Sequence, residues 1–111
     1  MHTNAAGEPI VMVEQRGSSA LVTLNRPEAR NAVSSEVTES VTEVLDQIEA
    51  DTSVRAVVLT GAGEVFSAGA DLKSRPDRSK AGERWQHNRR ARESYHSIRE
   101  CLKPVIAAVN G

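Results

Sequence analysis

The sequence RAVVLTGAGEVFSAGADLK occupies residues 55–73 and sets the expectations for the rest of the chain. It opens with a continuous apolar run, Ala56-Val57-Val58-Leu59, which is typical of a strand covered on both faces in a parallel sheet. A loop with three glycines follows over residues 61–71. Small residues after a buried strand allow a ligand to approach the backbone closely. The stretch therefore predicts a strand that leads into a binding loop, although an ordinary glycine-rich connection has the same composition.

The residues before this stretch predict a β-hairpin followed by a helix. Two short apolar segments, Ile10–Glu14 and Ala20–Leu24, flank a turn rich in Gly and Ser, as in a hairpin. Between residues 35 and 50 the apolar side chains recur at helical spacing, and Ser34 or Ser35 is a suitable N-cap. The order strand, helix, strand indicates a βαβ unit with a parallel sheet, so the predicted fold class is α/β.

The ends of the chain differ in character from its middle. Residues 1–9 are polar and are expected to form a flexible leader, which leaves residues 10–111 for the domain. After a polar connection, Lys73–Gly82, apolar residues at helical spacing predict a second helix that ends near Leu102. The apolar segment Val105–Val109 then predicts another buried strand.

The composition fits a soluble, cytoplasmic protein. A chain of 111 residues forms one domain at most, or part of one. Its content of 39% hydrophobic and 26% charged residues is ordinary for a globular protein. The single cysteine, Cys101, excludes an internal disulfide, and the first residues lack the apolar core of a signal peptide. No apolar segment is long enough to cross a membrane. The three histidines have no metal-ligand spacing, so no metal site is predicted.

The charges are unevenly distributed along the chain. Residues 73–103 hold ten Lys/Arg and four Asp/Glu, whereas the remaining residues hold four Lys/Arg and 11 Asp/Glu. A basic segment can meet anions such as nucleic acid or phosphate groups, but a solvated helix face is the more common explanation. No nucleic-acid partner is expected, because the segment lacks interleaved aromatic residues and any known nucleic-acid motif.

Two familiar glycine motifs do not fit the loop. A dinucleotide-binding turn needs a third glycine at the position of Phe66. A nucleophile elbow needs a glycine two residues before Ser67, where Val65 stands. What remains is a loop whose backbone N–H groups could stabilise a developing negative charge on a ligand oxygen.

Residues 66–73, FSAGADLK, resemble the F-x-A-G-A-D-[IL]-K signature of the crotonase superfamily, which includes enoyl-CoA hydratases and isomerases. Three further segments, residues 22–32, 55–61 and 103–111, match the family in order and spacing. The resemblance implies a crotonase-like spiral of ββα units, of which this chain is the N-terminal part. It also implies a homo-oligomer, a trimer or a hexamer.

The resemblance implies an acyl-CoA substrate, in which coenzyme A is part of the substrate and no separate cofactor is needed. Ala70 would donate one backbone N–H of an oxyanion hole to the thioester oxygen. Ala68 would contact the pantetheine amide through its backbone. The other positions that the resemblance places near the adenine and pantetheine are Glu28, Arg30, Ala32, Gly69, Asp71, Leu72 and Lys73.

The same resemblance places the second oxyanion donor and the acid–base carboxylates after Gly111, so the chain alone is not expected to be a competent hydratase. Three hypotheses stay open. The chain is the front of an enzyme that hydrates a 2-trans-enoyl-CoA, a coenzyme A-binding module without catalysis, or a fragment that pairs with a complementary chain. An incomplete sheet would expose apolar surface at Val105–Val109, so the isolated chain is expected to self-associate or to be partly ordered.

Overall fold

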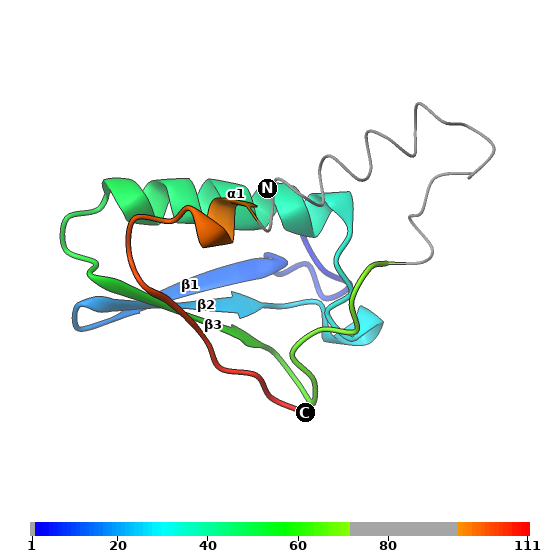
Figure 1. Ribbon diagram of the computed structural model, residues 1–111. Coiled ribbons are helices and arrows are strands. Elements are labelled where there is room, and N and C mark those ends of the chain that lie inside the picture. Colours follow the sequence, from blue (N-terminus) through cyan, green and yellow to red (C-terminus); the bar gives the residue numbers. More distant parts are fainter. Residues whose placement is uncertain (1, 72–95) are drawn as a thin grey trace.

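The computed structural model of the chain describes residues 2–71 and 96–111, which form one sheet with a helix along one of its faces (Figure 1). The strands of the sheet lie in the order β1-β2-β3-β4. The elements are β1 (Val11–Arg16), β2 (Ser19–Leu24), the short 3-10 helix η1 (Pro27–Ala29), α1 (Ser35–Ala50), β3 (Ala56–Gly61) and β4 (Val105–Ala107).

The strand pairings confirm the predicted hairpin and the predicted βαβ unit. β1 and β2 pair antiparallel, and the turn between them contains Gly17 in the left-handed region (φ +61°). β2 and β3 pair parallel, and α1 provides the connection between them. β3 also pairs parallel with β4. The carboxyl ends of β2 and β3 therefore lie at the same end of the sheet, and so do the segments that follow them.

Helix α1 spans the predicted residues because its start and its apolar stripe are both encoded locally. Ser34 is the N-cap, and its side chain accepts a hydrogen bond from Val37 N (3.3 Å). The buried stripe of α1 packs onto the face of the sheet that carries Val22 and Val57, neither of which is exposed. The buried apolar residues of α1 are Val37, Val41, Leu45 and Ile48. This single layer of contacts is the core of the described residues.

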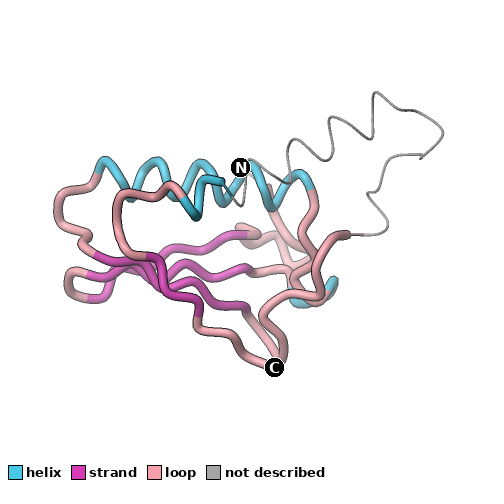
Figure 2. Tube along the Cα trace, viewed as in Figure 1, coloured by secondary structure: helices cyan, strands magenta, loops and turns pink. Residues whose placement is uncertain are grey.

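Two expectations about burial are wrong. β3 is not covered on both faces, because Val57 and Leu59 are buried whereas Val58 on the opposite face is only half-buried. β4 is not a buried strand, since Ile106 is 58% exposed at the edge of the sheet. Among the described residues, α1 covers one face of the sheet and no element covers the other (Figure 2). An apolar run indicates that both faces of a strand are hydrophobic, and the described residues cover only one of them.

The expected leader makes specific contacts with the rest of the chain. The N–H of Ile10 donates to His2 O (3.1 Å), and Asn4 Nδ2 donates to Asn25 O (2.9 Å). A hydrogen bond from Ala5 N to Glu28 Oε1 (3.1 Å) joins it to η1. Residues 2–9 thus lie against the end of β2.

The polar connection and most of the predicted second helix lie outside the described residues. Residues 96–99 form a helical turn, and Leu102 is not helical and is 89% exposed. No helix within residues 2–71 and 96–111 has the length and apolar character needed to cross a membrane.

Candidate functional site

The loop after β3 folds back against the segment that links β2 to α1. Asn31 Nδ2 donates to two loop carbonyls, Ala62 O (3.0 Å) and Val65 O (2.9 Å). Farther along the loop, Ser67 Oγ donates to Asn31 O (2.8 Å). The N–H of Ala68 donates to Arg30 O (2.9 Å). Ala68 is exposed, and it is the residue that the resemblance placed at the pantetheine. The loop is therefore held along its length by residues 30–31.

The Gly69–Ala70 peptide has a fixed orientation. Val33 and Ala70 form an isolated parallel bridge, in which Val33 N donates to Gly69 O (2.7 Å) and Asp71 N donates to Val33 O (3.0 Å). The carbonyl of Gly69 and the N–H of Ala70 belong to one trans peptide, so they point in opposite directions. The Ala70 N–H therefore points away from Val33.

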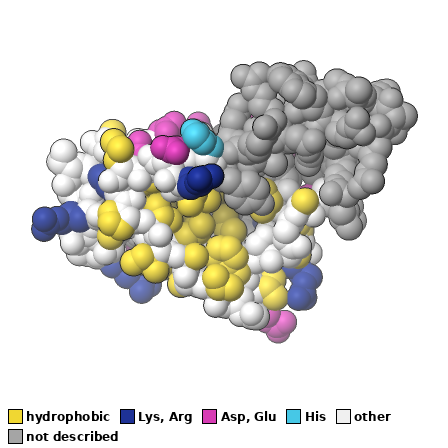
Figure 3. Space-filling view, viewed as in Figure 1, with side chains coloured by type: hydrophobic (Ala, Val, Ile, Leu, Met, Phe, Trp, Pro, Cys, Tyr) yellow, Lys and Arg dark blue, Asp and Glu magenta, His cyan; other side chains and the backbone are white. Residues whose placement is uncertain are grey.

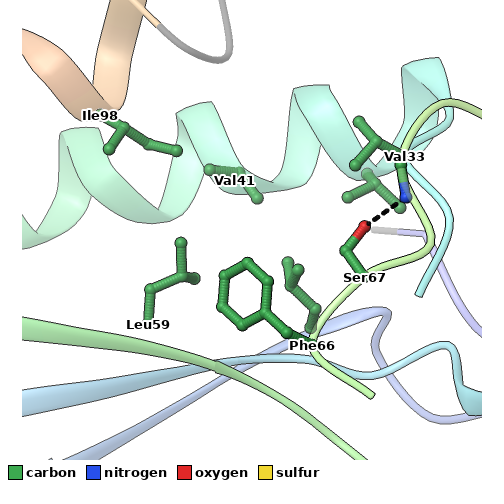
Figure 4. Close-up of a pocket in the computed structure, with 9 residues that line it drawn as sticks. Val33, Val41, Leu59, Phe66, Ser67 and Ile98 are labelled. Carbon is green, nitrogen blue, oxygen red and sulfur yellow. Dashed lines mark hydrogen bonds between the residues drawn. The ribbon is translucent and has the colours of Figure 1, made fainter. Parts of the chain in front are cut away.

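This N–H is a free donor within the part of the chain that the structure describes. No described residue accepts a hydrogen bond from it, and Ala70 itself is exposed. The conformation depends on Gly69, whose φ of +92° suits glycine. The Gly69 N–H donates to Ser67 Oγ (3.1 Å), the bond drawn at Ser67 in Figure 4. An exposed backbone donor with a fixed direction is able to stabilise negative charge on a ligand.

An ion pair fixes the end of the loop directly after Ala70. Arg26 Nη1 lies 2.7 Å from Asp71 Oδ2, and the Asp71 side chain is 9% exposed. Arg26 precedes η1, so this contact joins the loop to the end of β2 a second time. Asp71, which the resemblance placed near coenzyme A, here makes a contact within the protein.

The other residues singled out by resemblance lie around the same end of the sheet. Glu28 is exposed on η1, and Arg30 is exposed at the end of η1 with φ +53°. Ala32 is buried behind them. Leu72 and Lys73 lie outside the described residues. The structure thus gathers the described members on the η1 segment and the loop after β3, which face each other.

Sequence reasoning missed the asparagines that hold the loop. Asn31 is 1% exposed, and its signal in the sequence was only a polar residue in a turn between a strand and a helix. Asn110 bonds to the start of the loop, through Nδ2 to Gly61 O (2.9 Å) and through Oδ1 from Gly61 N (3.3 Å). Phe66 N donates to Asn110 O (2.7 Å). The segment after β4 therefore also shapes the loop after β3.

An apolar pocket of about 260 Å³ lies between α1 and the sheet, beside the loop. Yellow side chains line a hollow at this place in the space-filling view (Figure 3). Val41 enters from α1, Leu59 and Phe66 from the side of the sheet, and Ile98 from the helical turn (Figure 4). The remaining lining residues are Leu24, Val33, Val37, Ser67 and Gly69. The pocket has room for an apolar group, and none of the described residues that line it is charged.

The two shifted pKa values belong to groups near the C-terminal end of α1. The hydroxyl and backbone N–H of Ser53 lower the pKa of Asp51, beyond the C-terminal end of α1. Burial raises the pKa of the Cys101 thiol. No group of three His, Cys, Asp or Glu side chains able to hold a metal occurs among the described residues. What the described part of the loop offers is therefore a backbone donor.

The sequence profile described as Enoyl-CoA hydratase/isomerase matches residues 14–111. The chain is 40% identical over 102 residues to the short-chain-enoyl-CoA hydratase of Clostridium acetobutylicum, covering 91% of this chain and 39% of that protein. It is 39% identical over 105 residues to 4-chlorobenzoyl coenzyme A dehalogenase-2 of an Arthrobacter species, covering 91% and 38%.

The fold is also similar to solved structures. A crystal structure of an enoyl-CoA hydratase/carnithine racemase from Magnetospirillum magneticum aligns with a TM-score of 0.86 and 34% identity. The alignment covers 92% of this chain and 39% of that one. The chain therefore spans about two fifths of the length of the relatives it matches.

Proposed function

Because the chain belongs to the enoyl-CoA hydratase/isomerase family, the crotonase superfamily, we propose that its loop after β3 binds an acyl-CoA thioester and stabilises the enolate form of that thioester. The observation that carries the proposal is the N–H of the exposed residue Ala70, which has no acceptor among the described residues and a direction set by Val33. A preorganised donor aimed at a developing oxyanion is worth about 2.7–4 kcal/mol in the transition state.

The chemistry requires such a donor. Adding a nucleophile to a double bond conjugated with a thioester, or removing a proton beside the thioester, places negative charge on the thioester oxygen. A backbone N–H fixed before the reaction stabilises this charge without reorganisation of the protein. One relative is named a hydratase and another a dehalogenase, and both names specify coenzyme A thioesters. This supports an enolate as the shared step.

Within this chemistry we propose hydration of a 2-trans-enoyl-CoA as the reaction of the protein. Coenzyme A enters as part of the substrate, and we propose no separate cofactor. Among the residues proposed to lie near it, Glu28 and Arg30 are exposed on the segment that faces the loop, while Ala32 is buried. Gly69 supports the site by giving the Ala70 peptide its direction.

The test replaces Ala70 with proline, which removes the donor N–H. In the native protein, A70P should lower kcat for hydration of crotonyl-CoA about 100- to 1,000-fold, followed by loss of the enoyl absorbance. A70G keeps the N–H and serves as the control, with kcat expected to stay close to that of the native protein. Turnover by A70P equal to that of A70G would rule out Ala70 as the oxyanion donor.

A coenzyme A-binding module without catalysis is the second candidate. The observation that favours it is that the donor argued for here is a backbone N–H, which can bind an oxygen but cannot transfer protons. Proton transfer groups contribute about 100- to 10,000-fold to such reactions. Calorimetric titration with crotonyl-CoA and with coenzyme A separates the two candidates. Binding together with hydration supports the enzyme, and binding without hydration supports the module.

A further inference from the structure

We infer that Asn31 is a positioning residue for the Ala70 N–H, an inference that rests on the function proposed above. Asn31 is 1% exposed, and all the hydrogen-bonding groups of its side chain are used. Its two amide hydrogens serve the carbonyls of Ala62 (3.0 Å) and Val65 (2.9 Å), and its Oδ1 accepts from Arg26 N (2.8 Å). One side chain therefore joins the β2–α1 segment to the first half of the loop.

The second half of the loop is anchored to the same place. The backbone carbonyl of Asn31 accepts from Ser67 Oγ (2.8 Å), and that hydroxyl accepts from Gly69 N (3.1 Å). Two residues after Asn31, Val33 N donates to Gly69 O (2.7 Å). This carbonyl belongs to the same peptide as the Ala70 N–H. A displacement of Asn31 is therefore transmitted to the Ala70 donor through two contacts of Gly69. Its N–H is held by the Ser67 hydroxyl, and its carbonyl is held by Val33 N.

The backbone of Asn31 explains why this residue type stands there. Arg30 and Asn31 both adopt the left-handed region, with φ +53° and +54°. Asparagine tolerates this region better than most residues. It also carries two donors on one nitrogen, which is the number that the two loop carbonyls require. Aspartate keeps the shape and the backbone preference of asparagine but has no donor when it is ionised.

A second buried asparagine offers a matched control. Asn25 is 5% exposed, and its Nδ2 donates to Pro9 O (3.1 Å). Its backbone N–H donates to Ile10 O (2.7 Å). Like Asn31, it joins separate segments through backbone carbonyls, but those carbonyls belong to the N-terminal segment and not to the loop after β3. Asn25→Asp therefore reports the stability cost of such a substitution at a side chain that makes no hydrogen bond to the loop after β3.

The experiment compares N31D and N25D in the native protein with crotonyl-CoA. A misplacement of about 1 Å in a catalytic group costs roughly 100-fold in rate. We expect N31D to lower kcat per folded molecule by about that factor, with KM within about twofold of native, because the donor acts mainly on the transition state. The infrared stretching frequency of a thioester carbonyl falls when the carbonyl accepts a hydrogen bond. On binding, this frequency should fall less in N31D than in the native protein. N25D should lower the thermal midpoint while keeping the native kcat and the native carbonyl frequency.

The outcomes separate this inference from the proposed function. If N31D keeps the native kcat and carbonyl frequency, Asn31 is only structural and the inference is overturned while the proposed function stands. If the native protein itself leaves the thioester carbonyl frequency unchanged, both are overturned. Should N31D fail to fold, Asn31→Gly replaces it, because glycine accepts φ +54° and introduces no charge. The same loss of kcat and the same weaker carbonyl shift are expected of that variant.

Discussion

At the scale of single residues, Gly61 shows how closely the loop returns to the strand from which it comes. A Cβ at this buried position would overlap the carbonyl oxygen of Phe66 and lie 2.6 Å from that of Val65. Both are backbone atoms of the loop, so the loop itself has to move. We expect Gly61→Ala to lower the free energy of unfolding by about 1–3 kcal/mol, as other overpacked sites do. Chemical denaturation measures this loss.

Gly17 provides the contrasting control at the same scale. It has φ +61°, and nothing lies within 4 Å of a Cβ built there. Gly17→Asn should therefore leave stability nearly unchanged, because asparagine tolerates the left-handed region and meets no neighbour. If Gly61→Ala lowered the free energy of unfolding no more than Gly17→Asn, the close contact proposed between β3 and its loop would be contradicted.

The residue scale also shows where sequence reasoning reaches its limit at the site. The small residues of the loop allow a backbone donor there, but they equally fit an ordinary connection, and only the family resemblance places the donor at Ala70. The contacts that aim this donor join Asn31 to Val65, and Arg26 to Asp71, across 34 and 45 positions of the chain. Partners that far apart are set by the parallel pairing of β2 with β3, and no local pattern encodes them.

At the scale of secondary structure, the start of α1 is the most local of the predicted features and the simplest to test. Ser34 adopts an extended conformation (φ −96°, ψ 173°) and accepts the hydrogen bond of Val37 N. Ser34→Ala removes that acceptor and should cost about 1 kcal/mol of stability. Ser35→Ala, one position into the helix, is the control and should change stability much less, since alanine favours helix interiors. Equal losses in thermal melts of the two variants would contradict the capping role.

The elements that were predicted correctly are those whose signal lies within a few residues. The hairpin follows from turn residues between two apolar segments, and α1 from its apolar period and N-cap. The burial of β3 and β4 could not be predicted in the same way. An apolar residue such as Val58 or Ile106 indicates that burial is favourable, but it does not indicate which element covers it. The faces of a sheet are decided by what packs on them, which is a property of the tertiary structure.

At the scale of the whole molecule, the face of the sheet opposite α1 is apolar and open among the described residues. Leu21, Val58 and Ile106 are aligned across β2, β3 and β4 by the strand register, so their side chains share that face. Ile106 is 58% exposed, and β4 is the edge strand. Apolar surface next to an unpaired strand edge favours association with another sheet. The expected self-association of the chain thus has a defined surface.

Ile106→Lys tests this surface, because it places a charge at the middle residue of the edge strand β4, on the open face of the sheet. Charged residues on edge strands oppose pairing between sheets, so the variant should shift the chain toward smaller species at equal concentration. Sedimentation velocity over a range of concentrations measures the shift. Val13→Lys is the control, since Val13 is 48% exposed but lies on β1, at the other edge of the sheet and on the side of α1. A selective effect of Ile106→Lys assigns association to the open face and the β4 edge, whereas equal effects of the two variants would mean that general hydrophobicity drives it.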